Sequence, residues 1–233
     1  MASVTAQAKR SDQRKSVFRE YAESIIIAVV LALVIRAIVV QAFKIPSGSM
    51  EDTLLIGDHI LVNKLAYGLQ LPFWESKIQP FGLFGNPRRG DIIVFPFPRD
   101  PGRDFIKRVV GLPGDRVQVR HHRAYVNGEP IKDPYVKLDG HAALQSSRYS
   151  DWGPEVVPSG KLFVMGDNRD NSADSRDWGF LDSEKVKGRA FIIYWSWDSF
   201  MPKWGWLGGV PLPDPRAILL HGIRWRRIGK LLP

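Results

Sequence analysis

The chain has 233 residues, of which 44% are hydrophobic and 24% charged, and it contains no cysteine. This length and composition allow one well-packed domain with an appendage and exclude a disordered chain. The absence of cysteine excludes disulfide frameworks, thiolate metal sites and cysteine nucleophiles. The five histidines lack the spacing of a zinc-binding motif, so we expect no metal, and hydrolytic chemistry would have to use oxygen or nitrogen side chains.

The net charge of +9 is concentrated at the two ends of the chain. Residues 1–20 hold five basic and two acidic side chains, and residues 214–233 hold five basic and one acidic. Because the body between them is close to neutral, it lacks the basic face that binds phosphate backbones, and we expect no nucleic-acid partner. Salt-dependent DNA binding by residues 44–213 would reverse this interpretation.

An apolar stretch near the N-terminus predicts one transmembrane helix. Ile25–Ile35 reads IIIAVVLALVI and is followed by Arg36, so residues 21–42 are long enough to cross a bilayer. More Lys and Arg precede this stretch than follow it, which places residues 1–20 in the cytoplasm as a basic tail and residues 43–233 outside. A cleavable signal peptide ending at residue 42 and a buried core helix are the alternatives.

After this stretch the sequence is typical of β-strands. β-branched and aromatic residues alternate with polar ones and are bounded by Gly, Pro, Asn and Asp, and Asn127-Gly128 is a favoured hairpin turn. The predicted fold is mainly β, an antiparallel β-sheet domain after an N-terminal single transmembrane helix, with long loops at residues 69–89 and 138–160. The predicted strand segments are DHILVN, GDIIVFPF, DFIKRVV, RVQVRHHRAYVNGEPI, KLFVMG and RAFIIYW.

Ser47-Gly48-Ser49, on a turn that Pro46 initiates, could expose a nucleophilic hydroxyl beside a free backbone N–H. The same tripeptide is also ordinary loop composition. A serine nucleophile needs a base, and a lysine can serve only if an apolar environment lowers its pKa to near 7–8, at a cost of roughly 3–5 kcal/mol.

Lys107 lies in the segment FIKRVV, where the period of a strand places Phe105, Lys107 and Val109 on one face. An apolar surround of this kind would desolvate the amine. A solvent-exposed lysine on an edge strand is the alternative.

The run GDNRDNSADSR, residues 166–176, is unusually polar. It is either a solvated loop or a hydrogen-bonding scaffold in which carboxylates fix arginines and a hydroxyl orients a nearby base.

Together, IPSGSM, RRGDIIVF leading to FIKRVVGLPGD, and GDNRDNSADSR resemble the bacterial type I signal peptidase (leader peptidase) family between Phe43 and Phe191. The resemblance implies Ser–Lys catalysis without metal or cofactor, with Ser49 as nucleophile and Lys107 as general base. It further implies an oxyanion hole made by the Ser49 N–H and the Ser47 hydroxyl. The supporting residues would be Ser172, which holds the amine of the base, with Asp167, Asp174 and Arg176 as scaffold, the last two as an ion pair.

The same resemblance implies a groove of shallow apolar pockets for small side chains at positions −3 and −1 of the substrate. The substrates would be exported preproteins bearing signal peptides, cut at the bacterial inner (cytoplasmic) membrane by a single-pass monomer that contacts the lipid bilayer. The residues expected around the pockets are Phe43, Ile45, Met50, Ile60, Val94, Phe105 and Ile106.

One departure from the family pattern lies beside the expected nucleophile. Glu51-Asp52 precede Thr53 where the family usually has proline, and these carboxylates either raise the pKa of Lys107 or point into solvent. Two further hypotheses stay open: a Ser–Lys protease with one dedicated substrate, and a non-catalytic, membrane-anchored peptide-binding module.

Overall fold

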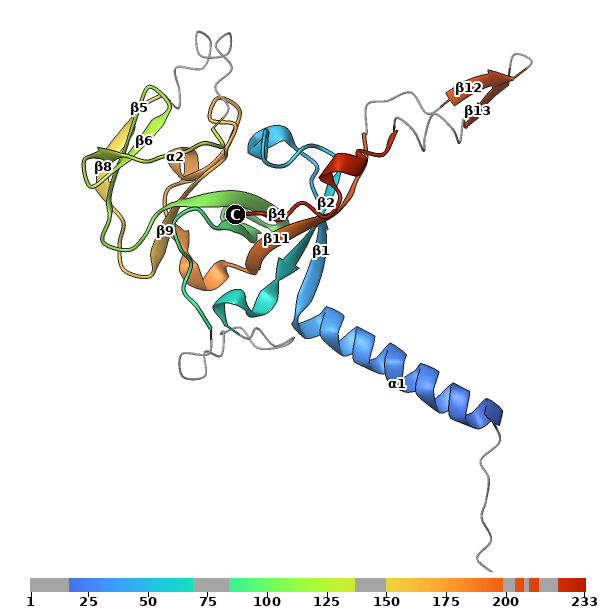
Figure 1. Ribbon diagram of the computed structural model, residues 1–233. Helices are drawn as coiled ribbons and strands as arrows, with labels where there is room; N and C mark the ends of the chain where they lie inside the picture. Colours follow the sequence, from blue (N-terminus) through green and yellow to red (C-terminus); the bar gives the residue numbers. More distant parts are fainter. Residues whose placement is uncertain (1–16, 69–83, 137–149, 199–203, 208–209, 214–221) are drawn as a thin grey trace, which may run out of the picture. The chain divides into compact units, whose positions relative to one another are not determined.

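The computed structural model describes residues 17–68, 84–136, 150–198, 204–207, 210–213 and 222–233 (Figure 1). Contacts divide the chain into two units that meet between Ala37 and Ile38. The second unit is built from antiparallel sheets, which confirms the predicted mainly-β fold. Most of the basic tail, residues 69–83 of the first predicted loop and residues 138–149 of the second lie outside the described residues.

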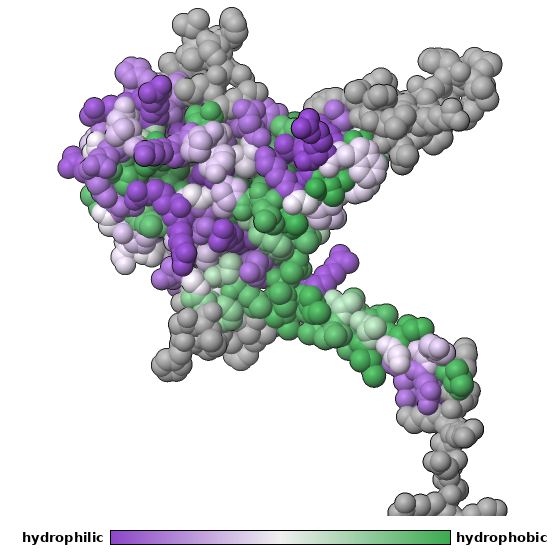
Figure 2. Space-filling view, in the orientation of Figure 1, coloured by the Kyte–Doolittle hydropathy of each residue, from purple (hydrophilic) through white to green (hydrophobic). Residues whose placement is uncertain are grey.

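The first unit contains helix α1, Val17–Ile38. Its apolar side chains are largely exposed: the exposed fraction is 62% for Ile25 and 67% for Ile27. Figure 2 shows most of the helix surface as hydrophobic. The predicted continuation of this helix to residue 42 is wrong, because Val40–Lys44 forms strand β1 and its backbone pairs in register with a second strand.

No helix in the described part of the chain combines the length and the apolarity that a membrane crossing requires.

The second unit is organised around a seven-stranded antiparallel sheet, which contains five of the six predicted strand segments. β4, the strand that carries Lys107, lies between β3 and β9 and is therefore an inner strand. In spatial order the sheet consists of β1 (Val40–Lys44), β2 (Asp58–Asn63), β11 (Gly188–Ser196), β3 (Ile92–Phe97), β4 (Asp100–Gly111), β9 (Lys161–Met165) and β10 (Leu181–Asp182).

A smaller four-stranded sheet and a separate two-stranded ribbon complete the described β-structure. Asn127 and Gly128 both have positive φ, 54° and 89°, and turn the chain between two strands of the smaller sheet, as their sequence predicts. The sheet has the order β7 (Glu129–Pro130), β6 (Arg123–Val126), β5 (Arg116–Arg120) and β8 (Trp152–Val156), and the ribbon pairs β12 (Trp204–Leu207) with β13 (Val210–Pro213).

Three apolar clusters contact the strand that carries Lys107. One joins β4 and β9 to the smaller sheet through Val110, Val117 and Phe163, all fully buried. A second packs Val109 of β4 against β3 and β9. The third packs β1, β2, β3 and β11 together, contacts Ile106 of β4 and includes Leu232, close to the C-terminal end of the chain. The short helical elements are α2 (Ser175–Trp178) and the 3₁₀ turns η1 (Gly48–Met50), η2 (Lys64–Tyr67), η4 (Ser183–Lys185) and η6 (Trp225–Arg227).

Candidate active site

The Ser-Gly-Ser segment forms a short turn that is held at both ends by buried side chains. Ile45 is 2% exposed and Met50 is fully buried, and both belong to the same apolar cluster. Between them the chain makes the 3₁₀ turn η1, with Ser47 at its N-cap and exposed, and Ser49 partly buried. These two buried side chains therefore hold the turn on the sheet, with Ser47 exposed and Ser49 partly exposed.

The side chain of Lys107 leaves the centre of β4 and reaches this turn. Its Nζ lies 2.8 Å from Ser49 Oγ and 2.9 Å from the carbonyl oxygen of Ile106. The residue is only 3% exposed, and its amine lies 5.1 Å from the centroid of the Phe105 ring. The predicted shared face of Phe105 and Lys107 is therefore confirmed, and the alternative of an exposed edge-strand lysine is wrong.

Burial determines the protonation of this amine. Desolvation lowers the pKa of Lys107 from its ordinary value of 10.5 to about 8, against the opposing charges of Asp174 and Asp167 and with the help of Arg176. The charges that oppose this shift are those of the buried scaffold, Asp174 and Asp167, and desolvation outweighs both. The Glu51 carboxylate lies over the turn, 2.9 Å from where a Cβ on Gly48 would stand.

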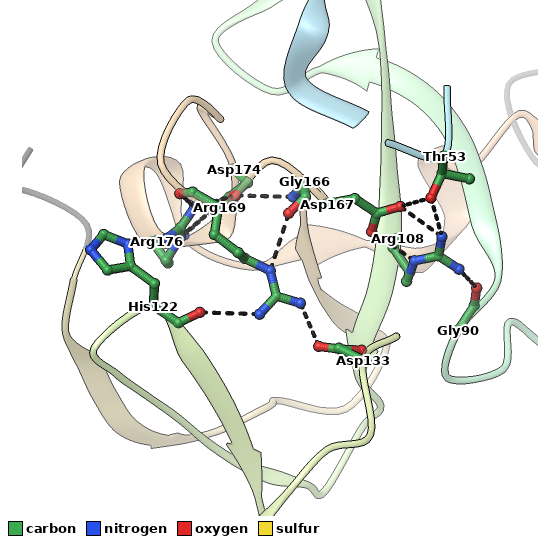
Figure 3. Close-up of polar contacts among 10 residues, drawn as sticks. All are labelled: Thr53, Gly90, Arg108, His122, Asp133, Gly166, Asp167, Arg169, Asp174 and Arg176. Carbon is green, nitrogen blue, oxygen red and sulfur yellow. Dashed lines mark hydrogen bonds and ion pairs between the residues drawn. The ribbon is translucent and has the colours of Figure 1, made fainter. Parts of the chain in front are cut away.

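The polar run 166–176 is a buried scaffold and not a solvated loop (Figure 3). Asp167 accepts two hydrogen bonds from Arg108, at 2.8 and 2.7 Å, and one from the Thr53 hydroxyl at 2.6 Å. Arg108 also donates to the carbonyl of Gly90 at 2.8 Å. Because Arg108 follows Lys107 in β4, this ion pair fixes the strand beside the amine.

The expected ion pair of Asp174 and Arg176 is confirmed. The carboxylate receives two bonds of 2.8 Å from the guanidinium, and it caps α2 by accepting from the Arg176 N–H. Arg176 in turn donates to the carbonyl of Arg169, and Arg169 donates to Gly166 and pairs with Asp133. Buried charges need such complete pairing, so the loop has little freedom to move.

Ser172 does not hold the amine of Lys107 as expected. Ser172 is buried, yet its hydroxyl has no hydrogen-bond partner among the described residues, and the carbonyl of Ile106 is the backbone acceptor for the amine. The reason is local: a Cβ on Gly166 would meet Ser172 Oγ at 2.3 Å, so this hydroxyl lies against the backbone of the loop.

A cavity of about 580 Å³ opens over Ser49 and Lys107. Of the residues expected around the substrate pockets, only Phe105 and Ile106 line it. The prediction is wrong for four others, Ile45, Met50, Ile60 and Val94, which are at most 2% exposed and belong to the closed core. Phe43 is partly buried and packs against that core. The lining consists of Pro46, Ser47, Gly48, Ser49, Arg103, Asp104, Phe105, Ile106, Lys107, Asn171 and Ala173.

Several functional neighbours were missed from the sequence. Asn168, Thr53 and Arg108 all contact the segments around Ser49, Lys107 and Asp167, and Arg103 and Asp104 line the cavity. Each lies within four residues of a predicted site residue, and this adjacency is the signal that could have found them. In the part of the chain that the structure describes, no group of three or more His, Asp or Glu side chains could hold a metal ion.

Comparisons with known proteins identify relatives of this chain. A family model described as "Signal peptidase, peptidase S26" matches residues 18–195. The chain is 40% identical over 212 residues to signal peptidase I of Pseudomonas aeruginosa, covering 76% of this chain and 72% of that protein. It is 35% identical over 231 residues to signal peptidase I of Aquifex aeolicus, covering 76% and 84%. A crystal structure of a signal peptidase I from Enterococcus faecalis V583 has 33% sequence identity and a TM-score of 0.36, and covers 45% of this chain and 97% of that one. The family model matches most of this chain, and the chain covers more than two thirds of two relatives that are over 30% identical to it. This chain therefore belongs to the signal peptidase family, peptidase S26.

Proposed function

We propose that this peptidase removes N-terminal signal peptides from exported preproteins with Ser49 as nucleophile and Lys107 as general base. The observation that carries the proposal is the 2.8 Å contact between Ser49 Oγ and Lys107 Nζ beneath an open cavity. A pKa of about 8 leaves about one amine in ten neutral at pH 7, whereas the ordinary value would leave fewer than one in a thousand. Burial thus supplies a usable base close to the operating pH.

In the first chemical step the neutral amine accepts the Ser49 proton as Oγ bonds to the scissile carbonyl carbon. The carbonyl π electrons move to oxygen, and the Ser49 N–H and the Ser47 hydroxyl stabilise that oxyanion; Ser47 lines the same cavity. The oxyanion then collapses, the C–N bond breaks, and the Lys107 ammonium gives its proton to the leaving amine. This leaves an acyl-enzyme on Ser49, and Lys107 is neutral again.

Deacylation repeats the sequence with water as nucleophile. Lys107 takes a proton from the water as its oxygen bonds to the acyl carbon, and the proton returns to Ser49 Oγ as the ester bond breaks. The carbonyl of Ile106, 2.9 Å from Nζ, keeps the amine directed at the reacting atoms through both steps. No step needs a metal ion or a cofactor.

We place the −1 and −3 side chains of the substrate against Phe105 and Ile106, the apolar part of the cavity wall. The closed core behind them favours small residues, because Ile45 and Met50 fill the space that a deeper pocket would need. A larger side chain at either position would require the well-packed core to move, which is costly.

The test is cleavage of a preprotein with alanine at −3 and −1 by the detergent-solubilised wild type, Ser49→Ala and Lys107→Ala. We expect the wild type to cut after the −1 alanine, as read by mass spectrometry, and both variants to lose nearly all activity. A matched preprotein with leucine at −1 should be cut poorly. Retained activity in Lys107→Ala would rule out the dyad, and an inert wild type would favour the peptide-binding module.

We also propose that α1, Val17–Ile38, holds the enzyme at the bacterial inner membrane, as a single-pass monomer with its N-terminus cytoplasmic and the β-domain outside. The exposed isoleucines, valines and leucines of α1 support this proposal, because an apolar surface of that length is costly in water. Alkaline carbonate extraction of membranes tests it. Residues 1–233 should stay in the pellet and residues 38–233, which keep the whole of β1, should be released; release of the whole chain would contradict the anchor.

A further inference from the structure

The nucleophile turn is clamped by Asn168, a residue that the catalytic mechanism does not use. Asn168 follows β9 and is 3% exposed. Its backbone N–H donates to the carbonyl of Ser49 at 3.1 Å, and its side-chain Nδ2 donates to the carbonyl of Gly48 at 3.2 Å. One residue therefore holds two successive carbonyls of the turn.

The Gly48 carbonyl matters because it belongs to the same peptide unit as the Ser49 N–H. A peptide unit is planar and trans, so its C=O and N–H point in opposite directions. Fixing the carbonyl on the Asn168 side consequently fixes the direction of the N–H on the other side. The remaining described bond to this carbonyl, from the Glu51 N–H at 3.1 Å, lies within the turn itself and does not tie the carbonyl to another segment.

The loop reaches the turn only because residue 166 is a glycine. A Cβ at this position would come within 2.5 Å of the Ser49 carbonyl oxygen, closer than side chains tolerate. The neighbouring Asp167 is bound to Arg108 in β4. Residues 166–168 thus bridge the turn that carries the nucleophile and the strand that carries the base.

We infer that Asn168 is a positioning residue for the oxyanion hole: its amide pins the Gly48 carbonyl and so aims the Ser49 N–H at the developing oxyanion. This inference rests on the proposed Ser–Lys mechanism. Since deleting one oxyanion donor typically lowers kcat by about a hundred- to a thousandfold, a misaimed donor should cost less, about ten- to a hundredfold. The substitution should lower kcat and leave the Kd of the substrate unchanged.

The experiment compares Asn168→Ala and Asn168→Asp with the wild type, using the full chain in detergent and a signal-peptide substrate. Asn168→Asp keeps the shape but places a carboxylate oxygen opposite the Gly48 carbonyl, so its kcat should be at least as low as that of Asn168→Ala. Asn63→Ala is the matched control, because Asn63 bonds the backbone N–H of Leu65 outside the cavity. Substrate affinity is measured by fluorescence anisotropy in a Ser49→Ala background with and without Asn168→Ala.

The expected result is a kcat loss of ten- to a hundredfold in both Asn168 variants, with a substrate Kd within about twofold of the parent. Two results overturn the inference: a kcat within about twofold of wild type, or a kcat loss matched by an equal loss of affinity, which would make Asn168 part of the groove. Unfolding curves of the variants identify any that fail to fold, and Asn168→Ser then replaces them. If Ser49→Ala itself stays active, the proposed function fails first and separately.

Discussion

Replacing Lys107 by methionine should stabilise the protein at neutral pH while abolishing catalysis. The amine is 3% exposed, and burial lowers its pKa from 10.5 to about 8. One pKa unit corresponds to about 1.4 kcal/mol, so below pH 8 the buried ammonium lowers the free energy of unfolding by about 3 kcal/mol. Methionine keeps the apolar stem and removes the charge, but it also loses the bonds to Ser49 and Ile106, worth about 1 kcal/mol each.

The sign of the pH dependence follows from which state binds more protons. Between pH 8 and 10.5 the unfolded chain keeps its proton on Lys107 and the folded chain does not, so wild-type stability rises with pH in this window. We therefore expect Lys107→Met to exceed the wild type by about 1–3 kcal/mol in unfolding free energy at pH 7, and this advantage to disappear by about pH 10.5.

Urea unfolding in detergent, followed by tryptophan fluorescence from pH 7 to 10.5, measures this difference. Lys161→Met is the control, because Lys161 pairs with Asp182 at the surface and is partly exposed. Its effect should be small over the lower part of the range. A Lys107→Met difference that stays constant over the whole pH range would refute the claim that a buried, destabilised amine serves as the base.

Three further predictions concern activity and the scaffold. The wild-type kcat/KM should rise with pH with an apparent pKa of about 8 and be about a hundredfold below its plateau at pH 6, and a plateau already reached by pH 7 would contradict a lysine base. Arg108→Met leaves the buried Asp167 carboxylate without its ion-pair partner, so urea unfolding should show the free energy of unfolding lowered by about 3–5 kcal/mol. A decrease of less than about 1 kcal/mol would show that the pair does not stabilise the fold. Gly166→Ala forces a Cβ to within 2.5 Å of the Ser49 carbonyl oxygen and should lower kcat at least about tenfold. Gly85→Ala should not, because a Cβ at residue 85 would meet its nearest neighbour, the Ala66 carbonyl oxygen, at an ordinary contact distance of 3.6 Å; equal activities would refute the close approach.

The strands were predictable because alternation and turn residues are local properties of the sequence. β2, β3 and β4 each begin close to Gly, Asp or Asn, and the Asn127-Gly128 turn needs only its own φ angles. β1 was missed because Val40 continues an apolar run, and only pairing with β2 distinguishes a strand from further helix there. β8 was missed because Trp152–Val156 lies in a polar, Gly- and Pro-containing region and depends on β5 for its hydrogen bonds.

The contact between Ser49 and Lys107 was predictable from the resemblance of the motifs to the family, but the shape of the pocket was not. Ile60 and Val94 alternate correctly for an apolar face, yet sequence alone does not show whether that face is open or covered. In the fold they pack with Leu232, from a segment about 140 residues or more away along the chain. The contacts of Ser172 were likewise not predictable from the sequence, because its hydroxyl lies against Gly166 in the folded loop.

The most direct test of the central claim is to trap the covalent intermediate. Rapid acid quenching of the wild type with a signal-peptide ester substrate, followed by intact-mass and peptide mapping, should show the acyl group on Ser49. The Ser49→Ala variant should show no adduct, and Lys107→Ala should acylate far more slowly. An adduct on another residue, or steady turnover with no adduct at any time after mixing, would contradict a Ser49–Lys107 acyl-enzyme mechanism.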